Sequence, residues 1–179
     1  MSTSQRILDS IRRIVRLLRE GSHASEASVG LSGAQLFVLQ KLDPAHPLSL
    51  KELAARTLTH QSSVSVVVSK LVERGLVQRR PAESDARRLA ILPTKEGMRL
   101  RGRAPAPAAQ DRLLTALSAL PAVEQRRLAD ALEQLVRALG LDEREALMLF
   151  TEEPSSRSSS SRAPRRSASR RKKRANKRA

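Results

Sequence analysis

Apolar residues follow helical spacing along the first part of the chain. Ile7 and Ile11 begin a pattern with an apolar residue every three or four positions and arginines between them, which predicts an amphipathic helix. The polar stretch of residues 21–30 is expected to end this helix. A second helix is expected after Ser32, which can cap it, and the Asp-Pro-Ala-His-Pro run at 43–47 then breaks the pattern.

Two short helices joined by a tight turn are predicted next. Ser49, with Glu52 three residues later, forms a capping box at the start of the first of them. Residues 57–59 make the turn, and the second helix spans about 60–74, with Gly75 placed for a left-handed C-terminal cap. The apolar stripe that would hold this second helix to a core consists of Val64, Val67, Val68 and Leu71.

A β-hairpin and further helices complete the pattern. Two extended segments, 76–80 and 88–92, flank a polar turn. Thr94 can cap a following helix, which Pro105 and Pro107 are expected to interrupt. A long helix beginning near residue 121 and a short apolar helix at 141–150 come last. This order of elements indicates a mainly α fold, in which a helix-turn-helix is followed by a small β-hairpin wing.

Positive charge is concentrated at the C-terminus. The chain has 34 Lys and Arg against 18 Asp and Glu, and residues 154–179 hold 11 of the basic residues and none of the acidic ones. This segment cannot support a core and is predicted to be disordered. It acts either as a solubilising tail or as an arm on DNA, and its densest cations are Arg165, Arg166, Arg170, Arg171, Lys172, Lys173 and Arg174.

Several classes of function find no support. Cys, Trp and Tyr are absent, which excludes thiolate metal sites and disfavours modules that stack single-stranded bases on aromatic rings. No metalloprotease, phosphate-loop or nucleophile-elbow motif is present, and no apolar run approaches the roughly 18 residues of a membrane span. We therefore expect a cytoplasmic, nucleoid-associated protein that is not an enzyme, holds no cofactor or metal and has no membrane partner.

The second helix of the predicted pair carries a polar outward side. Gln can make two hydrogen bonds to adenine, Ser can bond bases or phosphates, and an apolar Val66 can touch a thymine methyl. The alternative is a helix surface that is merely polar and small. The candidate DNA-contacting residues of this helix are His60, Gln61, Ser62, Ser63, Ser65, Val66, Ser69 and Lys70.

The hairpin carries a second cluster of candidates, Arg79, Arg80, Asp85, Arg87 and Arg88. An Arg at the tip of such a wing can enter the minor groove, where the negative potential is strongest, and Asp85 could hold the Arg87 guanidinium in place. The alternative is a surface ion pair of little consequence.

The segment from Ser49 to Gly97 resembles the winged helix-turn-helix of the MarR family of bacterial regulators. The wing sequence Asp-Ala-Arg-Arg at 85–88, followed by Leu-Pro-Thr at 92–94 and then Gly97, is the most specific part of the resemblance. Other matching features are Leu-Ala at 53–54, Ser-Val-Ser at 63–65 and Leu-Val-Glu-Arg-Gly-Leu-Val at 71–77. The flanking helices fit as well, so that the resemblance extends over about residues 5–140.

The resemblance implies a sequence-specific regulator that binds double-stranded DNA as a homodimer on an inverted repeat. Such dimers usually repress transcription, and many release DNA when a small ligand binds. The implied organisation is an N-terminal dimerisation helix and linking helix (1–45), the DNA-binding region (46–97), C-terminal dimerisation helices (98–153) and the basic tail (154–179).

Three departures from the family pattern leave alternatives open. Pro105 and Pro107 fall where a long continuous helix is expected, which affects the shape of the dimer arms. Val66 stands where the family often has Arg, and the near absence of aromatic residues gives little basis for an aromatic-ligand pocket, so no ligand site is carried over. One alternative is an architectural, nucleoid-type protein that coats DNA through its tail with little sequence preference. Another is a ligand-binding or protein-interaction module that kept the fold and lost DNA binding.

Overall fold

The computed structural model describes residues 1–82, 85–104, 107–141 and 148–149. These residues form helices and one hairpin, as the pattern predicted. In chain order the elements are α1 (Thr3–Val29), α2 (Gly33–Lys41), α3 (Leu50–Thr57), α4 (Gln61–Glu73), β1 (Val77–Ala82), β2 (Asp85–Pro93), α5 (Lys95–Arg103), α6 (Ala109–Ser118) and α7 (Ala122–Ala138).

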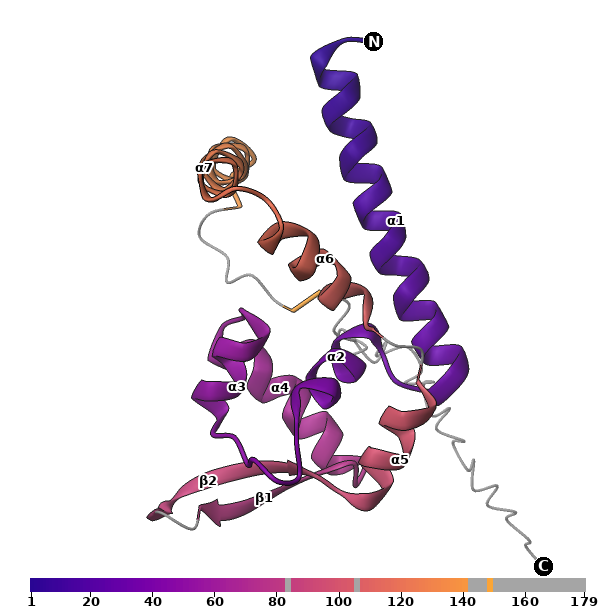
Figure 1. Cartoon of the computed structure of the whole chain (residues 1–179), viewed down its shortest axis with the longest axis vertical. Coiled ribbons are helices and arrows are strands. Elements are labelled where there is room, and N and C mark those ends of the chain that lie inside the picture. Colours follow the sequence, from indigo (N-terminus) through magenta and orange to yellow (C-terminus); the bar gives the residue numbers. More distant parts are fainter. Residues whose placement is uncertain (83–84, 105–106, 142–147, 150–179) are drawn as a thin grey trace, which may run out of the picture.

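The elements divide into a compact head and a pair of projecting arms (Figure 1). The head contains α2, α3, α4, α5 and the antiparallel hairpin of β1 and β2. The long helix α1 runs away from it, and α6 leads to α7 near the far end. The fold is therefore a winged helix-turn-helix with helical extensions, which confirms the expected fold class.

Helix α2 forms the centre of the core. It lies against α1, α3, α4, α5 and α6. Four consecutive apolar residues of α2 point in successive directions around the helix, yet none is more than 2% exposed; they are Leu36, Phe37, Val38 and Leu39. A helix that is apolar all round needs neighbours on every side, and α2 has them.

The expected end of the first helix at residues 21–30 is wrong, because α1 continues to Val29 and is capped by Gly30 with φ 66°. Two of the polar residues in this stretch, Ser22 and Ser25, are buried at the connection to α2. The Ser22 hydroxyl accepts a hydrogen bond from the Gly33 N–H (3.0 Å), and the Ser25 hydroxyl donates to the Leu31 carbonyl (2.7 Å). These small polar side chains satisfy the backbone of the α1–α2 connection, so the stretch forms helix and not loop.

The proline-rich interruption of the C-terminal helices is confirmed, since α5 ends at Arg103 and α6 begins at Ala109. Gln40 at the end of α2 accepts a hydrogen bond from the Ala108 N–H (3.1 Å), and Lys41 pairs with Asp111. The break therefore lets α6 dock on the end of α2.

Two predictions fall outside the structure as described. The helix expected at 141–150 lies mostly among residues that the structure does not describe, and the tail at 154–179 lies wholly among them. Within the described ranges, no helix combines the length and apolar character needed to cross a bilayer.

Candidate nucleic-acid interface

The helix pair is built by local signals at its two ends. The Ser49 hydroxyl accepts from the Glu52 N–H (3.2 Å) while the Glu52 carboxylate accepts from the Ser49 N–H (2.7 Å), which confirms the capping box. The predicted turn is also confirmed. Its central residue, Leu58, has φ 50° and ψ 44°. This left-handed conformation reverses the chain tightly enough to set α4 against α3.

Helix α4 presents two sharply different sides. Val64, Val67, Val68 and Leu71 are at most 1% exposed, so the predicted apolar stripe is confirmed. Gln61, Ser62 and Val66 are exposed, and Ser65, Ser69 and Lys70 are half-buried. These six side chains lie on or near the outward side, as expected.

One candidate on this helix is misplaced. Ser63 is 4% exposed and lies on the buried side with Val64 and Val67, so the expectation that it faces outward is wrong. Ser63 lies four positions before Val67, so the two share one side of the helix, and the small Ser side chain fits there. His60 precedes the helix at the N-cap position, where its exposed side chain makes no capping hydrogen bond.

The wing follows directly from the end of α4. Gly75 has φ 68°, which confirms the left-handed cap, and Leu76 packs into the core. The strands pair from Val77 opposite Pro93 to Ala82 opposite Asp85, so they are longer and their turn is shorter than the sequence predicted. A further bridge joins Leu48 to Ile91, which holds the base of the wing to the head.

A hydrogen bond joins the wing to the outward side of α4. Arg79 on β1 donates from Nη2 to the Ser69 hydroxyl on α4 at 3.0 Å. Arg80, the next residue of the strand, is exposed. The structure thus brings members of two groups of sequence-predicted candidates together; in Figure 1 the hairpin lies along the lower edge, with α4 above it.

The tip of the wing is described only in its backbone. Side chains of residues 82–88 are outside the described part, so the pairing of Asp85 with Arg87 and the placement of Arg88 stay predictions.

Sequence analysis missed the residue that fixes the other end of α4. Arg74 donates from Nη1 to the Gly30 carbonyl (2.8 Å) and to Oε1 of the buried Gln35 (3.0 Å). Gly30 lies 44 positions away in the chain, so no local pattern could have paired the two. This contact ties the end of α4 to the connection between α1 and α2, and hence to the arms.

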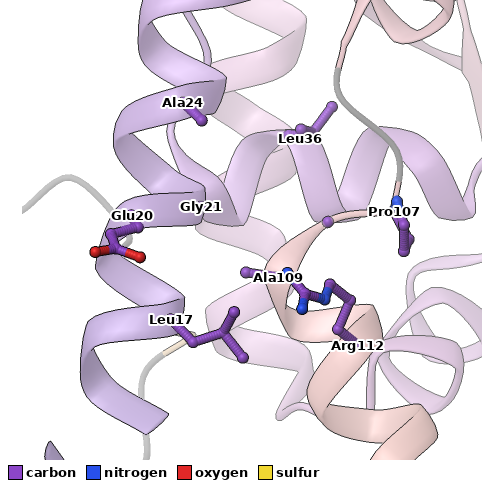
Figure 2. A pocket seen from close by; sticks show the side chains of 9 residues that line it. Leu17, Glu20, Gly21, Ala24, Leu36, Pro107, Ala109 and Arg112 are labelled. Carbon is purple, nitrogen blue, oxygen red and sulfur yellow. The ribbon is translucent and has the colours of Figure 1, made fainter. Parts of the chain in front are cut away.

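A pocket of about 420 Å³ lies between α1 and α6 (Figure 2). Leu17, Ala24 and Leu36 give it apolar walls. Glu20 of α1 and Arg112 of α6 lie on opposite sides. Its size falls in the range of small-molecule sites.

The comparisons with known proteins identify the head. Residues 29–88, which contain α2, α3, α4, β1 and the start of β2, match the model of the MarR family. Over this segment the chain is similar to the winged helix-turn-helix of the MarR family. The resemblance to the MarR family that the wing sequence indicated is thereby confirmed.

Solved structures extend the likeness from the head to the arms. Sco3205 from Streptomyces coelicolor, a MarR family transcriptional regulator in complex with DNA, is 24% identical, with a TM-score of 0.52 over 80% of this chain and 92% of that one. A MepR like protein complexed with pseudoligands is 22% identical, with a TM-score of 0.50 over 78% of this chain and 97% of that one. At these identities the likeness shows the fold alone. No curated protein matches the chain.

Proposed function

We propose that this chain is a sequence-specific DNA-binding regulator that represses transcription as a homodimer on an inverted repeat. The observation that carries the proposal is the hydrogen bond from Arg79 to Ser69, because it joins the wing to the outward side of α4. An exposed helix beside a hairpin fits duplex DNA, since the helix can enter the major groove while the hairpin reaches the flanking backbone. The MarR-family match of the head supports this use. Such a protein acts in the cytoplasm, on the DNA of the nucleoid.

Each part of the surface has its own task in this proposal. Gln61, Ser65 and Val66 face base edges, while Ser62 and Lys70 lie where they can approach phosphates. The wing arginines contact the flanking groove, where a narrow minor groove attracts guanidinium groups. Val64 and its buried neighbours hold the helix rigidly to the head and do not contact DNA.

The exposed apolar sides of the arms support a homodimer. Helix α7 has an apolar stripe at helical spacing, yet none of its residues is buried. The N-terminal half of α1 shows the same pattern. An amphipathic helix is stable in water when its apolar side is covered, and a second copy of this chain supplies a matching side. The residues concerned are Ile7, Leu8, Ile11, Ile14 and Val15 on α1, and Val123, Leu128, Leu132, Leu135, Val136 and Leu139 on α7.

Fluorescence anisotropy with the full chain tests DNA binding directly. One probe is the duplex upstream of its own gene, and the other is a scrambled duplex of the same composition, both across a salt series. We expect a preference on the order of a thousandfold for the upstream DNA, as specific regulators show. Arg87→Ala should weaken that binding about tenfold because it removes a groove contact, whereas Arg127→Ala on α7 removes an equal charge and should leave it unchanged.

Sedimentation velocity tests the dimer. Leu132→Asp places a carboxylate in the apolar stripe and should yield monomers, while Arg127→Asp introduces the same group on a side chain that is 73% exposed and should not. A wild-type chain that stays monomeric at micromolar concentration would remove the homodimer, and with it the inverted repeat, from the proposal.

The charge of the tail favours a second candidate, an architectural protein that coats DNA. Every basic residue that meets a phosphate adds a salt slope of about −0.9, with no preference for sequence. A chain ending at Glu153 separates the two functions. Retained preference for the upstream duplex means that the head reads sequence and the tail adds affinity. If preference is absent and affinity vanishes with the tail, the architectural function holds.

Release by a small ligand is the remaining part of the proposal. The pocket is lined by both arms, α1 and α6, and by Leu36 of the head. Arg112, which also lines it, suits an anionic group. A ligand seated there would bias the angle between arm and head, and so the spacing of the two recognition helices in a dimer. A panel of small aromatic and aliphatic acids tests this part of the proposal. An acid that weakens DNA binding by the wild type but not by Arg112→Ala supports it.

A further inference from the structure

We infer that Val66 reads a thymine in each half-site by packing its methyl groups against the thymine methyl in the major groove. This inference rests on the proposed DNA-binding function and adds the chemical identity of a base that the protein selects. It makes Val66 the specificity-determining residue of α4.

The first observation is that the core does not need Val66. The three other valines of α4 (Val64, Val67 and Val68) are at most 1% exposed, whereas Val66 is 49% exposed. A single exposed apolar residue is ordinary in itself. The position of Val66 points to a function, because it lies on the outward side of α4, between the turn and the wing.

The second observation concerns the neighbours of Val66 on the helix surface. Residues three and four positions apart are adjacent on a helix, so Ser62, Ser69 and Lys70 lie beside Val66 on the outward side. The two serines have short side chains, and the longer Lys70 side chain is half-buried. A valine methyl reaches only a short way from the backbone and touches a base only if the helix lies deep in the groove. The short serines permit that depth.

The third observation is the placement of charge along α4. The sequence from Gln61 to Ser69 contains no Lys or Arg, the side chains that most often bind guanine through its O6 and N7 atoms. Lys70 follows at the end of this run, and the Arg79 guanidinium of the wing is held at Ser69. The first part of the helix, from Gln61 to Val66, is thus without cations, and Val66 is an apolar group among hydroxyl groups there.

These observations select one base chemically. In the major groove, guanine, cytosine and adenine present only hydrogen-bond donors and acceptors at their edges, and thymine alone adds a methyl group. An apolar side chain gains by covering that methyl and loses by covering an unpaired donor or acceptor. Val66 therefore favours an A·T pair with the thymine methyl toward the helix.

The test uses DNA that differs by a single methyl group. Sites are first selected from a randomised duplex library with the full chain, and each thymine of the selected site is then replaced in turn by deoxyuridine. We expect one position per half-site at which the replacement weakens binding about fourfold, the value of one buried methyl group. The other positions should show no comparable loss.

Variants of Val66 assign that loss to one side chain. Val66→Thr keeps one methyl and should retain the difference between thymine and deoxyuridine, while Val66→Ser should abolish it. Circular dichroism checks that both variants are folded. Val66→Arg should shift the selected base at the same position toward guanine, because Arg binds its O6 and N7 atoms.

The outcomes separate this inference from the function on which it rests. If the chain selects a defined site but no deoxyuridine replacement weakens binding, or if Val66→Ser keeps the full difference, the inference is overturned and the regulator stands. If the library yields no preferred site, both are overturned.

Discussion

Arg79 and Ser69 form a hydrogen bond between the wing and α4. The Arg79 Nη2 atom lies 3.0 Å from the Ser69 hydroxyl, which accepts the hydrogen bond. The two residues stand ten positions apart in the chain, with the left-handed turn at Gly75 between them. Because the bond is exposed, its contribution to stability is small; its value lies in holding a cation at a defined place beside α4.

The first prediction is that Ser69 and Arg79 act as one unit in DNA binding. Ser69→Ala and Arg79→Ala should each lower affinity for the selected site by roughly threefold to tenfold, since each loses the positioned guanidinium. The double variant should be no weaker than the Arg79→Ala variant. Anisotropy titrations of the four proteins give the coupling directly.

Ser65 provides the matched control for that cycle. It is a half-buried serine on the same helix, one turn from Ser69. The effects of Ser65→Ala and Arg79→Ala should add. Additive effects for Ser69 and Arg79 as well would show that their bond has no part in recognition.

Local signals allowed the sequence to predict most of the fold. The capping box of Ser49 and Glu52 and the left-handed Gly75 each depend on residues a few positions apart, and both are found as predicted. The Thr94 cap is equally local, since its hydroxyl accepts from the Gly97 N–H at 3.1 Å. Such capping contacts can be predicted without knowledge of the tertiary structure because both partners are close in the chain.

Features that depend on packing could not be predicted. The polar pattern places Gly21 at a helix end, but this glycine lies inside α1. A Cβ added to Gly21 would come within 2.5 Å of the Ala109 Cβ on α6. The role of Gly21 is to allow two helices to approach closely. The burial of Ser63 and the contacts of Arg74 likewise depend on which elements meet, and hydrophobic spacing within one helix does not reveal that.

The second prediction concerns the junction between the wing and α5. A Cβ at Gly97 would collide with the carbonyl oxygen of Leu76, the residue directly before β1. Gly97→Ala should therefore cost at least about 2 kcal/mol of unfolding free energy. Gly102→Ala, in the same helix with nothing within 4 Å, should instead stabilise the protein by about 0.5–1 kcal/mol. Urea denaturation of both variants measures this contrast, and equal effects would mean that the close approach is absent.

The third prediction concerns the strained turn between α3 and α4. Leu58 is a non-glycine residue with φ 50° and is 75% exposed, so its side chain gains little from burial while its Cβ disfavours this conformation. Leu58→Gly should raise stability by up to about 1 kcal/mol, a balance of relieved strain against greater freedom in the unfolded chain. Leu58→Ala keeps the Cβ and should bring no gain. Thermal unfolding distinguishes the two, and a gain from both would point to removal of the exposed leucine rather than to relief of strain.

The fourth prediction is a pH dependence in the loop between α2 and α3. The His46 ring donates to the Asp43 carboxylate (2.9 Å), and the Ala45 N–H donates to its other oxygen (3.0 Å). These hydrogen bonds, that of His46 first, lower the pKa of Asp43 below its ordinary value of 3.8. A carboxyl whose pKa is depressed by folding stabilises the folded state above the unfolded pKa. That stabilisation is lost as the pH falls through the folded pKa, so the effect is confined to acidic solution.

Carbon-detected NMR titration of the Asp43 carboxyl measures this pKa. We expect His46→Ala to raise it toward the ordinary value, because the first of the two hydrogen bonds is lost while that from Ala45 remains. His23→Ala removes an equally exposed histidine on α1, which lies near Glu26 instead, and should leave the Asp43 titration unchanged. If the Asp43 pKa were the same in the wild type and in His46→Ala, the loop would owe its structure to the Ala45 contact alone, and histidine at position 46 would have no electrostatic role.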